Sequence, residues 1–210
     1  MRIAPRTVLQ IVLILAYPVG VHLGTLLKSE HWYFAAMVLL CAGVLLRPLL
    51  NRDKYAWAIF IFFSTLASAT FYANAVFYLI ALPPILLPLF ILFVFAQSLL
   101  PGREPLVTAI GEASRGPLTQ AMRNYTHKVT LCWTLLLSYF VLSALIFTIS
   151  APQWVWSLMV NGFNHLLVGV FFVGEFVYRK HKFPEHNHPG FIEYIKIVFT
   201  SNPIREKSGD

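Results

Sequence analysis

One apolar stretch near the end of the chain carries side chains that can exchange protons. Residues 154–178 contain one carboxylate and one imidazole among amides and aromatic rings. At 100° per residue, the following residues fall within about a third of the circumference of a helix: Asn161, Asn164, His165, Phe172 and Glu175. Ionisable groups are costly inside a membrane, so this stripe is predicted to face the interior of a helix bundle. His165 and Glu175 are therefore candidate acid/base residues.

Simpler interpretations exist for two of the ionisable groups. Glu175 precedes Arg179 by four residues, the spacing at which opposite charges pair on a helix. An ion pair at the membrane interface is therefore the alternative to catalysis. His22 stands alone between Gly20 and Gly24 in another apolar stretch. We predict that it is neutral and hydrogen-bonded to a neighbouring helix, with a proton or substrate role as the alternative.

A second set of side chains suits the binding of anions. The stretch 102–130 holds six charged residues, whereas the 26 residues at 75–100 hold none. This stretch and the start of the tail supply the candidate binding residues: Arg115, Arg123, Tyr125, Lys128, Arg179 and Lys180. Lipid phosphates or an acidic protein are the expected partners, and Glu112 and Glu175 are the internal alternatives. Pro105 and Pro117 each suit the first turn of a short amphipathic helix lying on the membrane surface.

The chain offers little for metal, cofactor or nucleic-acid chemistry. A few metal-ligand residues gather in the tail, but without a standard ligand spacing: His181, Glu185, His186 and His188. No phosphate-binding glycine loop, hydrolase nucleophile elbow or nucleic-acid-binding motif occurs. We therefore predict no metal, no cofactor and no nucleic-acid partner. Cys41 and Cys132 lie in apolar segments and are predicted to act as small hydrophobic residues.

The elements that position these residues are predicted to be transmembrane helices. Of 210 residues, 58% are hydrophobic and only 12% are charged, about half the charged share of a soluble domain. Apolar stretches of about 20 residues, each long enough to cross a bilayer, occur at 7–27, 32–50, 55–72, 75–100, 130–150 and 154–178. The predicted fold class is an all-α polytopic membrane helix bundle with about six transmembrane helices and short interfacial amphipathic helices. Pro83, Pro84 and Pro88 predict a kink or break in the fourth span.

The basic residues divide unevenly between the two sides of such a bundle. Six spans place both termini on one side, and of the 16 Lys and Arg residues only Lys28 then falls on the other side. The positive-inside rule predicts that both termini lie in the cytoplasm. The predicted parts are a four-helix membrane half (1–100), a cytoplasmic amphipathic loop (101–129), a membrane helix pair (130–178) and a cytoplasmic tail (179–210). An amphipathic interfacial helix is predicted in that tail after Gly190.

Several motifs in the second half resemble those of a known family. The segments "REPLVTAI", "RGPL", "NYTHKVTLCW" and "EFVYRKHKFP" are similar to signatures of a family of uncharacterised bacterial inner-membrane proteins. Genes of that family often lie among those for fatty-acid-like or polyketide-like synthesis, including aryl polyene pigments. The sequence departs from the family pattern at His127, where arginine is expected. The resemblance implies a membrane component of acyl-chain assembly and assigns no catalytic residue.

Three functions are consistent with these features. The first is an inner-membrane accessory protein that holds acyl-synthesis enzymes or an acyl carrier protein at the cytoplasmic face, with membrane lipids as further partners. The second is a transporter or flippase for the lipidic product, for which a homodimer would compensate for the small size of the chain. The third is a membrane-embedded acyl- or glycosyl-transferase that uses His165, Glu175, Tyr125 and Arg179.

Overall fold

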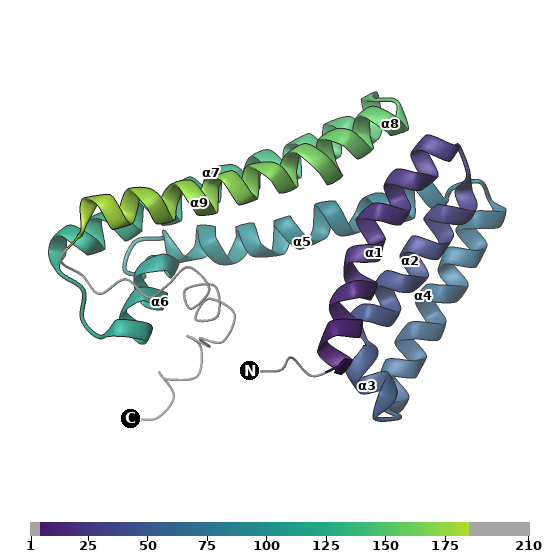
Figure 1. Cartoon of the computed structure of the whole chain (residues 1–210), viewed down its shortest axis with the longest axis horizontal. Helices are drawn as coiled ribbons and strands as arrows, with labels where there is room; N and C mark the ends of the chain where they lie inside the picture. Colours follow the sequence, from purple (N-terminus) through teal and green to yellow (C-terminus); the bar gives the residue numbers. More distant parts are fainter. Residues whose placement is uncertain (1–4, 185–210) are drawn as a thin grey trace. The chain divides into compact units, whose positions relative to one another are not determined.

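The chain folds entirely into helices over the residues that can be described. The structure is a computed structural model that describes residues 5–184. In chain order the helices are α1 (Pro5–Leu27), α2 (Glu30–Val44), α3 (Leu46–Leu50), α4 (Lys54–Tyr72), α5 (Val76–Ser98), α6 (Leu106–Arg115), α7 (Gln120–Ser150), α8 (Gln153–Trp156), the π-helix η1 (Ser157–Phe163) and α9 (Asn164–Lys182) (Figure 1). The all-α fold class is therefore confirmed. The interfacial helix predicted after Gly190 lies outside the described residues.

Within residues 5–184, five helical stretches are long and apolar enough to cross a membrane, so the chain is a multi-pass membrane protein by the length and composition of its helices. The second predicted span is divided, because α2 ends at Val44 and α3 begins at Leu46. The two pieces nevertheless follow α1 along its length. Gly24 packs against the ring of Tyr33 near one end of α1, and Arg47 Nη2 donates to Thr7 Oγ1 at 3.2 Å near the other.

The helices form two compact units, which are described separately below. Unit 1 consists of Met1–Ile85 with Ser143–Asn164, and unit 2 consists of Leu86–Leu142 with His165–Asp210. In unit 1, the helices α1, α2 and α4 lie side by side as a bundle (Figure 1). Its core includes Tyr17, Val21, Tyr33, Met37, Ala67, Val76, Ile80, Ala144, Trp156 and Val160.

Two glycines allow α1 and α2 to approach each other closely. A Cβ atom on Gly20 would lie 3.0 Å from the Cβ of Ala36, and one on Gly24 would lie 2.4 Å from the ring of Tyr33. The second distance is far too short for any side chain. The pair therefore acts as a small-residue seam, the usual means of bringing membrane helices together in the absence of a hydrophobic driving force.

His22, on the same helix, makes the contact that its isolated position predicts. Its Nδ1 lies 3.2 Å from the hydroxyl oxygen of Ser157 in η1. The hydrogen bond to a neighbouring helix is therefore confirmed. It connects α1 to the π-helical segment within unit 1.

The prolines of α5 do not break the helix, which runs without interruption from Val76 to Ser98. The predicted break is therefore wrong, and the alternative of a kink stays a prediction. A side chain of α1 compensates for one of the three prolines. Pro84 has no N–H, so the carbonyl of Ile80, four residues earlier, loses its helical donor. The Tyr17 hydroxyl donates to that carbonyl instead. Both residues are buried, so this hydrogen bond satisfies a carbonyl that the apolar surroundings would otherwise leave without a partner.

We expect Tyr17→Phe to lower the free energy of unfolding by about 1–2 kcal/mol, because it leaves the Ile80 carbonyl buried without a donor. In a Pro84→Ala background the helix regains its own donor, so the same substitution should then cost much less. Denaturation by SDS in mixed micelles measures both differences. Tyr72→Phe, which removes a hydroxyl from an 83% exposed side chain, is the matched control. Equal losses in the two backgrounds would contradict this role for Tyr17.

Candidate functional site

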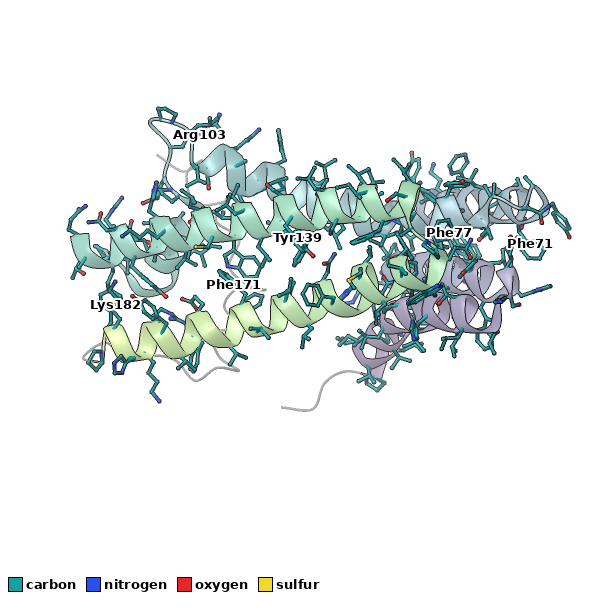
Figure 2. The ribbon with its side chains drawn as sticks, turned by 90° about the horizontal axis from the view of Figure 1, so that it is seen from above. Phe71, Phe77, Arg103, Tyr139, Phe171 and Lys182 are labelled. Atoms are coloured by element: carbon teal, nitrogen blue, oxygen red, sulfur yellow. The ribbon has the colours of Figure 1, made fainter. Side chains whose placement is uncertain are left out.

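One end of unit 2 gathers Glu175 and those candidate binding residues whose side chains the structure describes. It is formed by α6, the first turns of α7 and the last turns of α9 (Figure 1). Figure 2 shows Arg103 and Lys182 toward this end, with Tyr139 and Phe171 midway along the long helices. We call this region the polar end of unit 2.

The length of α7 explains why polar groups collect there. Its 31 residues extend over about 46 Å, whereas the hydrocarbon layer of a bilayer is about 30 Å thick. Its exposed side chains change from polar at Asn124 and Lys128 to apolar at Leu131 and Leu135. The surface helix predicted to start at Pro117 is therefore not separate, because α7 begins at Gln120 and continues directly into the span.

A buried ion pair occupies the contact between α7 and α9. Arg179 Nε donates to Glu175 Oε1 at 2.9 Å, and the two side chains are only 8% and 7% exposed. The Tyr125 hydroxyl of α7 donates to the same carboxylate oxygen at 3.2 Å. The i, i+4 ion pair predicted from the sequence is thus present. It is buried, and it is bound across to the neighbouring helix.

Two further aromatic rings pack against Tyr125, next to the ion pair. Tyr125 stacks on Tyr178, with ring centroids 5.9 Å apart and planes inclined by 27°. Phe183 meets Tyr125 edge-on, with centroids 5.5 Å apart. The Lys182 ammonium lies over all three rings, at 5.5 Å from the centroids of Tyr125 and Tyr178 and 5.9 Å from that of Phe183. We call these three rings the aromatic cage.

A second ionic centre fastens α6 to α7. Arg123 donates to Glu112 at 2.6 Å through Nη1 and to Glu104 at 3.0 Å through Nη2. Its side chain is 43% exposed, so solvent screens these pairs and each contributes less than a buried pair would. Beneath them, the buried hydroxyls of Thr108 and Thr126 share a hydrogen bond of 2.7 Å.

Side chains from other helices satisfy the first amides of α6. Its N-cap residue is Pro105, which has no side-chain acceptor. The Leu106 N–H donates to Ser98 Oγ at 3.0 Å, and the Val107 N–H donates to Thr130 Oγ1 at 3.2 Å. The start of α6 is thereby fixed to both α5 and α7.

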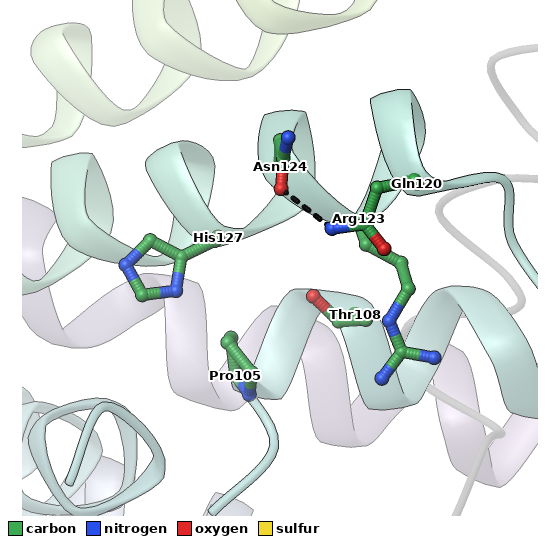
Figure 3. A pocket seen from close by; sticks show the side chains of 6 residues that line it. All are labelled: Pro105, Thr108, Gln120, Arg123, Asn124 and His127. Carbon is green, nitrogen blue, oxygen red and sulfur yellow. Dashed lines mark hydrogen bonds between the residues drawn. The ribbon is translucent and has the colours of Figure 1, made fainter. Parts of the chain in front are cut away.

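A small open pocket of about 190 Å³ lies between α6 and α7. It is lined by Pro105, Thr108, Gln120, Arg123, Asn124 and His127 (Figure 3). Gln120 Nε2 donates to Asn124 Oδ1 at 3.1 Å, as the dashed line in Figure 3 marks. Because two carboxylates already hold the Arg123 guanidinium, the pocket lacks the surplus positive charge that an anion would require.

The candidate binding residues do not form a single site. Tyr125 and Arg179 meet at Glu175, whereas Arg123 belongs to the separate centre with Glu104 and Glu112. Lys128 and Lys180 are exposed. The side chain of Arg115 lies outside the described residues, as do Glu185, His186 and His188 of the tail.

The predicted polar stripe is not continuous. Asn164 is buried and Asn161 is half-buried, but His165 is exposed and does not face inward. At 100° per residue, His165 lies at the edge of the predicted stripe, about 100° around α9 from Asn164 and about 80° from Glu175, and only the part of the stripe with the last two is turned inward. The acid/base pair of His165 and Glu175 therefore loses the shared face on which it depended. Glu175 is committed to Arg179 and Tyr125.

Several residues of the polar end escaped sequence reasoning. Tyr178 and Phe183 form the cage with Tyr125, and Lys182 lies over the three rings. Tyr178 and Lys182 have the i, i+4 spacing of helix neighbours. That spacing was a usable signal. Thr108 gave none, because a single threonine in a short helix has no distinguishing pattern. Among the described residues, no group of three or more His, Cys, Asp or Glu is placed to hold a metal.

A comparison of the chain with known protein families, curated proteins and solved structures finds no match. The likeness of its motifs to the inner-membrane family therefore remains a prediction.

Removing one member of the buried ion pair should destabilise the protein strongly. We expect Glu175→Met or Arg179→Met to lower the free energy of unfolding by about 3–5 kcal/mol, because each leaves a buried charge uncompensated. The double substitution should cost less than either single one, since no buried charge remains. Denaturation by SDS in mixed micelles gives all three values. Arg123→Met, at the exposed ion pairs, should cost about 1 kcal/mol or less, and similar losses at the two centres would refute this assignment.

Proposed function

We propose that the protein is an accessory component of an acyl-assembly system in the bacterial inner membrane. In this proposal the polar end of unit 2 faces the cytoplasm and holds an acidic acyl carrier protein, or the enzymes that carry it, at the membrane. The acyl chain is then extended next to the bilayer that receives it. The protein itself supplies position and performs no reaction.

The balance of charge at the polar end carries this proposal. In the described part of unit 2, every carboxylate is engaged by an arginine: Glu104 and Glu112 by Arg123, and Glu175 by Arg179. The remaining cations are Arg103, Lys128, Lys180 and Lys182, all exposed. The surface therefore presents surplus positive charge, which favours an acidic partner and speeds its association.

The motif resemblance supplies the chemical class of that partner. Carrier proteins are acidic and are central to the pathways whose genes accompany the family. The transferase alternative has less support, because Glu175 is buried in an ion pair and His165 lies apart from it. No specific contact in the described residues favours a transporter over an accessory protein.

Charge reversal at the exposed lysines tests the partner. We expect Lys128→Glu with Lys180→Glu to weaken binding of an acyl carrier protein to the full chain in detergent by tenfold or more, with the wild-type affinity falling as salt is raised. Biolayer interferometry with immobilised carrier protein measures both effects. Arg52→Glu with Lys54→Glu makes the same change in charge in unit 1 and should leave most of the affinity. An equal loss of affinity from the two double substitutions, or undiminished binding after Lys128→Glu with Lys180→Glu, would contradict the proposal.

The orientation has a separate test. With Cys41 and Cys132 replaced by serine, a single cysteine at Lys180 should react with a membrane-impermeant maleimide in inverted inner-membrane vesicles but not in intact spheroplasts. A single cysteine at Asn74, in the turn between α4 and α5, should show the opposite pattern. The reverse result at both positions would place the polar end outside the cytoplasm.

A further inference from the structure

The aromatic cage already binds a cation, namely the chain's own Lys182. The three rings come from two different helices and the residue after α9, and they converge on one ammonium at 5.5 to 5.9 Å. Rings arranged in this way attract an ammonium through their negative faces, and quaternary ammonium ligands are recognised by the same arrangement.

The cage is firmly supported on one side and accessible on the other. Tyr125 is 8% exposed, and its hydroxyl is bound to Glu175, so its ring has a fixed orientation. Tyr178, by contrast, is 55% exposed, and Lys182 is exposed as well. A ligand therefore reaches the rings without any movement of the helices, provided that the flexible Lys182 side chain leaves them.

The position of the cage indicates which ligand it meets. After His165, the exposed side chains of α9 are apolar at Leu166, Val170, Val173 and Val177. They are followed directly by the exposed polar residues Tyr178, Lys180, His181 and Lys182. An exposed apolar stripe that ends in tyrosine and basic residues is typical of the boundary between acyl chains and lipid headgroups. The cage thus lies at headgroup depth, next to a surface that suits acyl chains.

The positive charge of Lys182 determines which kind of lipid headgroup the cage favours. A simple cation in the cage would place a second positive charge beside Lys182. A zwitterionic headgroup brings a phosphate together with its ammonium. When that ammonium enters the cage, the displaced Lys182 pairs with the phosphate, and each charge keeps a partner.

From these contacts we propose that the aromatic cage of Tyr125, Tyr178 and Phe183 is a binding site for the ammonium of a zwitterionic phospholipid headgroup, with Lys182 exchanging from the rings to the lipid phosphate. The site does not depend on the carrier-protein proposal. It gives unit 2 a specific lipid contact at the point where α9 leaves the apolar layer.

The lipid retained by the full-length protein tests the cage. Native mass spectrometry after purification from vesicles of equal parts dioleoyl phosphatidylethanolamine and dioleoyl phosphatidylglycerol should show preferential retention of the zwitterionic lipid. Tyr178→Leu should reduce that preference about threefold to tenfold. The matched control is Tyr55→Leu, because Tyr55 is exposed and carries a single lysine, Lys54, 5.1 Å from its ring centroid. The control should leave the preference unchanged.

The exchange of Lys182 has its own readout with soluble probes. Wild-type protein in detergent should bind phosphocholine several-fold more tightly than tetramethylammonium, because only phosphocholine offers a phosphate to Lys182. In Lys182→Met that difference should disappear, while tetramethylammonium should bind more tightly than to wild type. Equal lipid retention by the two tyrosine variants would overturn the site. An unchanged difference between the probes in Lys182→Met would overturn the exchange, and the rings would then serve only to fix Lys182.

Discussion

A polar group in an apolar layer must find a partner within the protein, and both units are organised around this requirement. In unit 1, the carbonyl that Pro84 leaves without a donor is satisfied by Tyr17 from another helix. In unit 2, a buried carboxylate is held by Arg179 and by Tyr125 from a neighbouring helix. Each contact joins two helices through a polar group that apolar side chains could not satisfy. Such contacts therefore add a directional restraint to the packing of the apolar residues around them.

The two kinds of basic residue have different roles at the polar end. Arg123 and Arg179 each form ion pairs with glutamates, in keeping with the planar guanidinium and its several donors. Lys128 and Lys180 stay exposed, where a strongly hydrated ammonium costs least. Because the two arginines engage all three glutamates, which leaves one negative charge in excess, the exposed lysines together with Arg103 make the surface of the described polar end positive. The residues predicted to bind anions included both the paired arginines and the exposed lysines, since sequence alone does not show which cations are already paired.

Hydropathy and charge were sufficient to predict the helical fold, the approximate positions of five of the six spans and the ion pair of Glu175 with Arg179. The remaining span, 32–50, is divided between the 15-residue α2 and the short α3. Hydropathy and charge failed where an interaction between distant residues decides the outcome. The carbonyl of Ile80, which Pro84 leaves without a helical donor, is satisfied by Tyr17, 63 residues away. The exposure of His165 depends on how far the neighbouring helices reach around α9, which hydrophobic periodicity does not reveal. The cage depends on α7 and α9 lying together, so only its part within α9 had a sequence signal.

The π-helix also affects how this chain should be aligned with its relatives. A wide turn holds one more residue than an α-helical turn of similar rise, so a relative that is one residue shorter between Ser157 and Phe163 still forms a helix there, with ordinary winding. The same deletion between Glu175 and Arg179 would leave the two charges at i, i+3 spacing, but it would turn every later residue of α9, including Tyr178 and Lys182, by about 100° relative to Glu175 and its contact with α7. Single-residue gaps should therefore be tolerated in η1 and excluded from the last turns of α9. An alignment that places such gaps in those last turns would pair residues that do not occupy the same position on the helix.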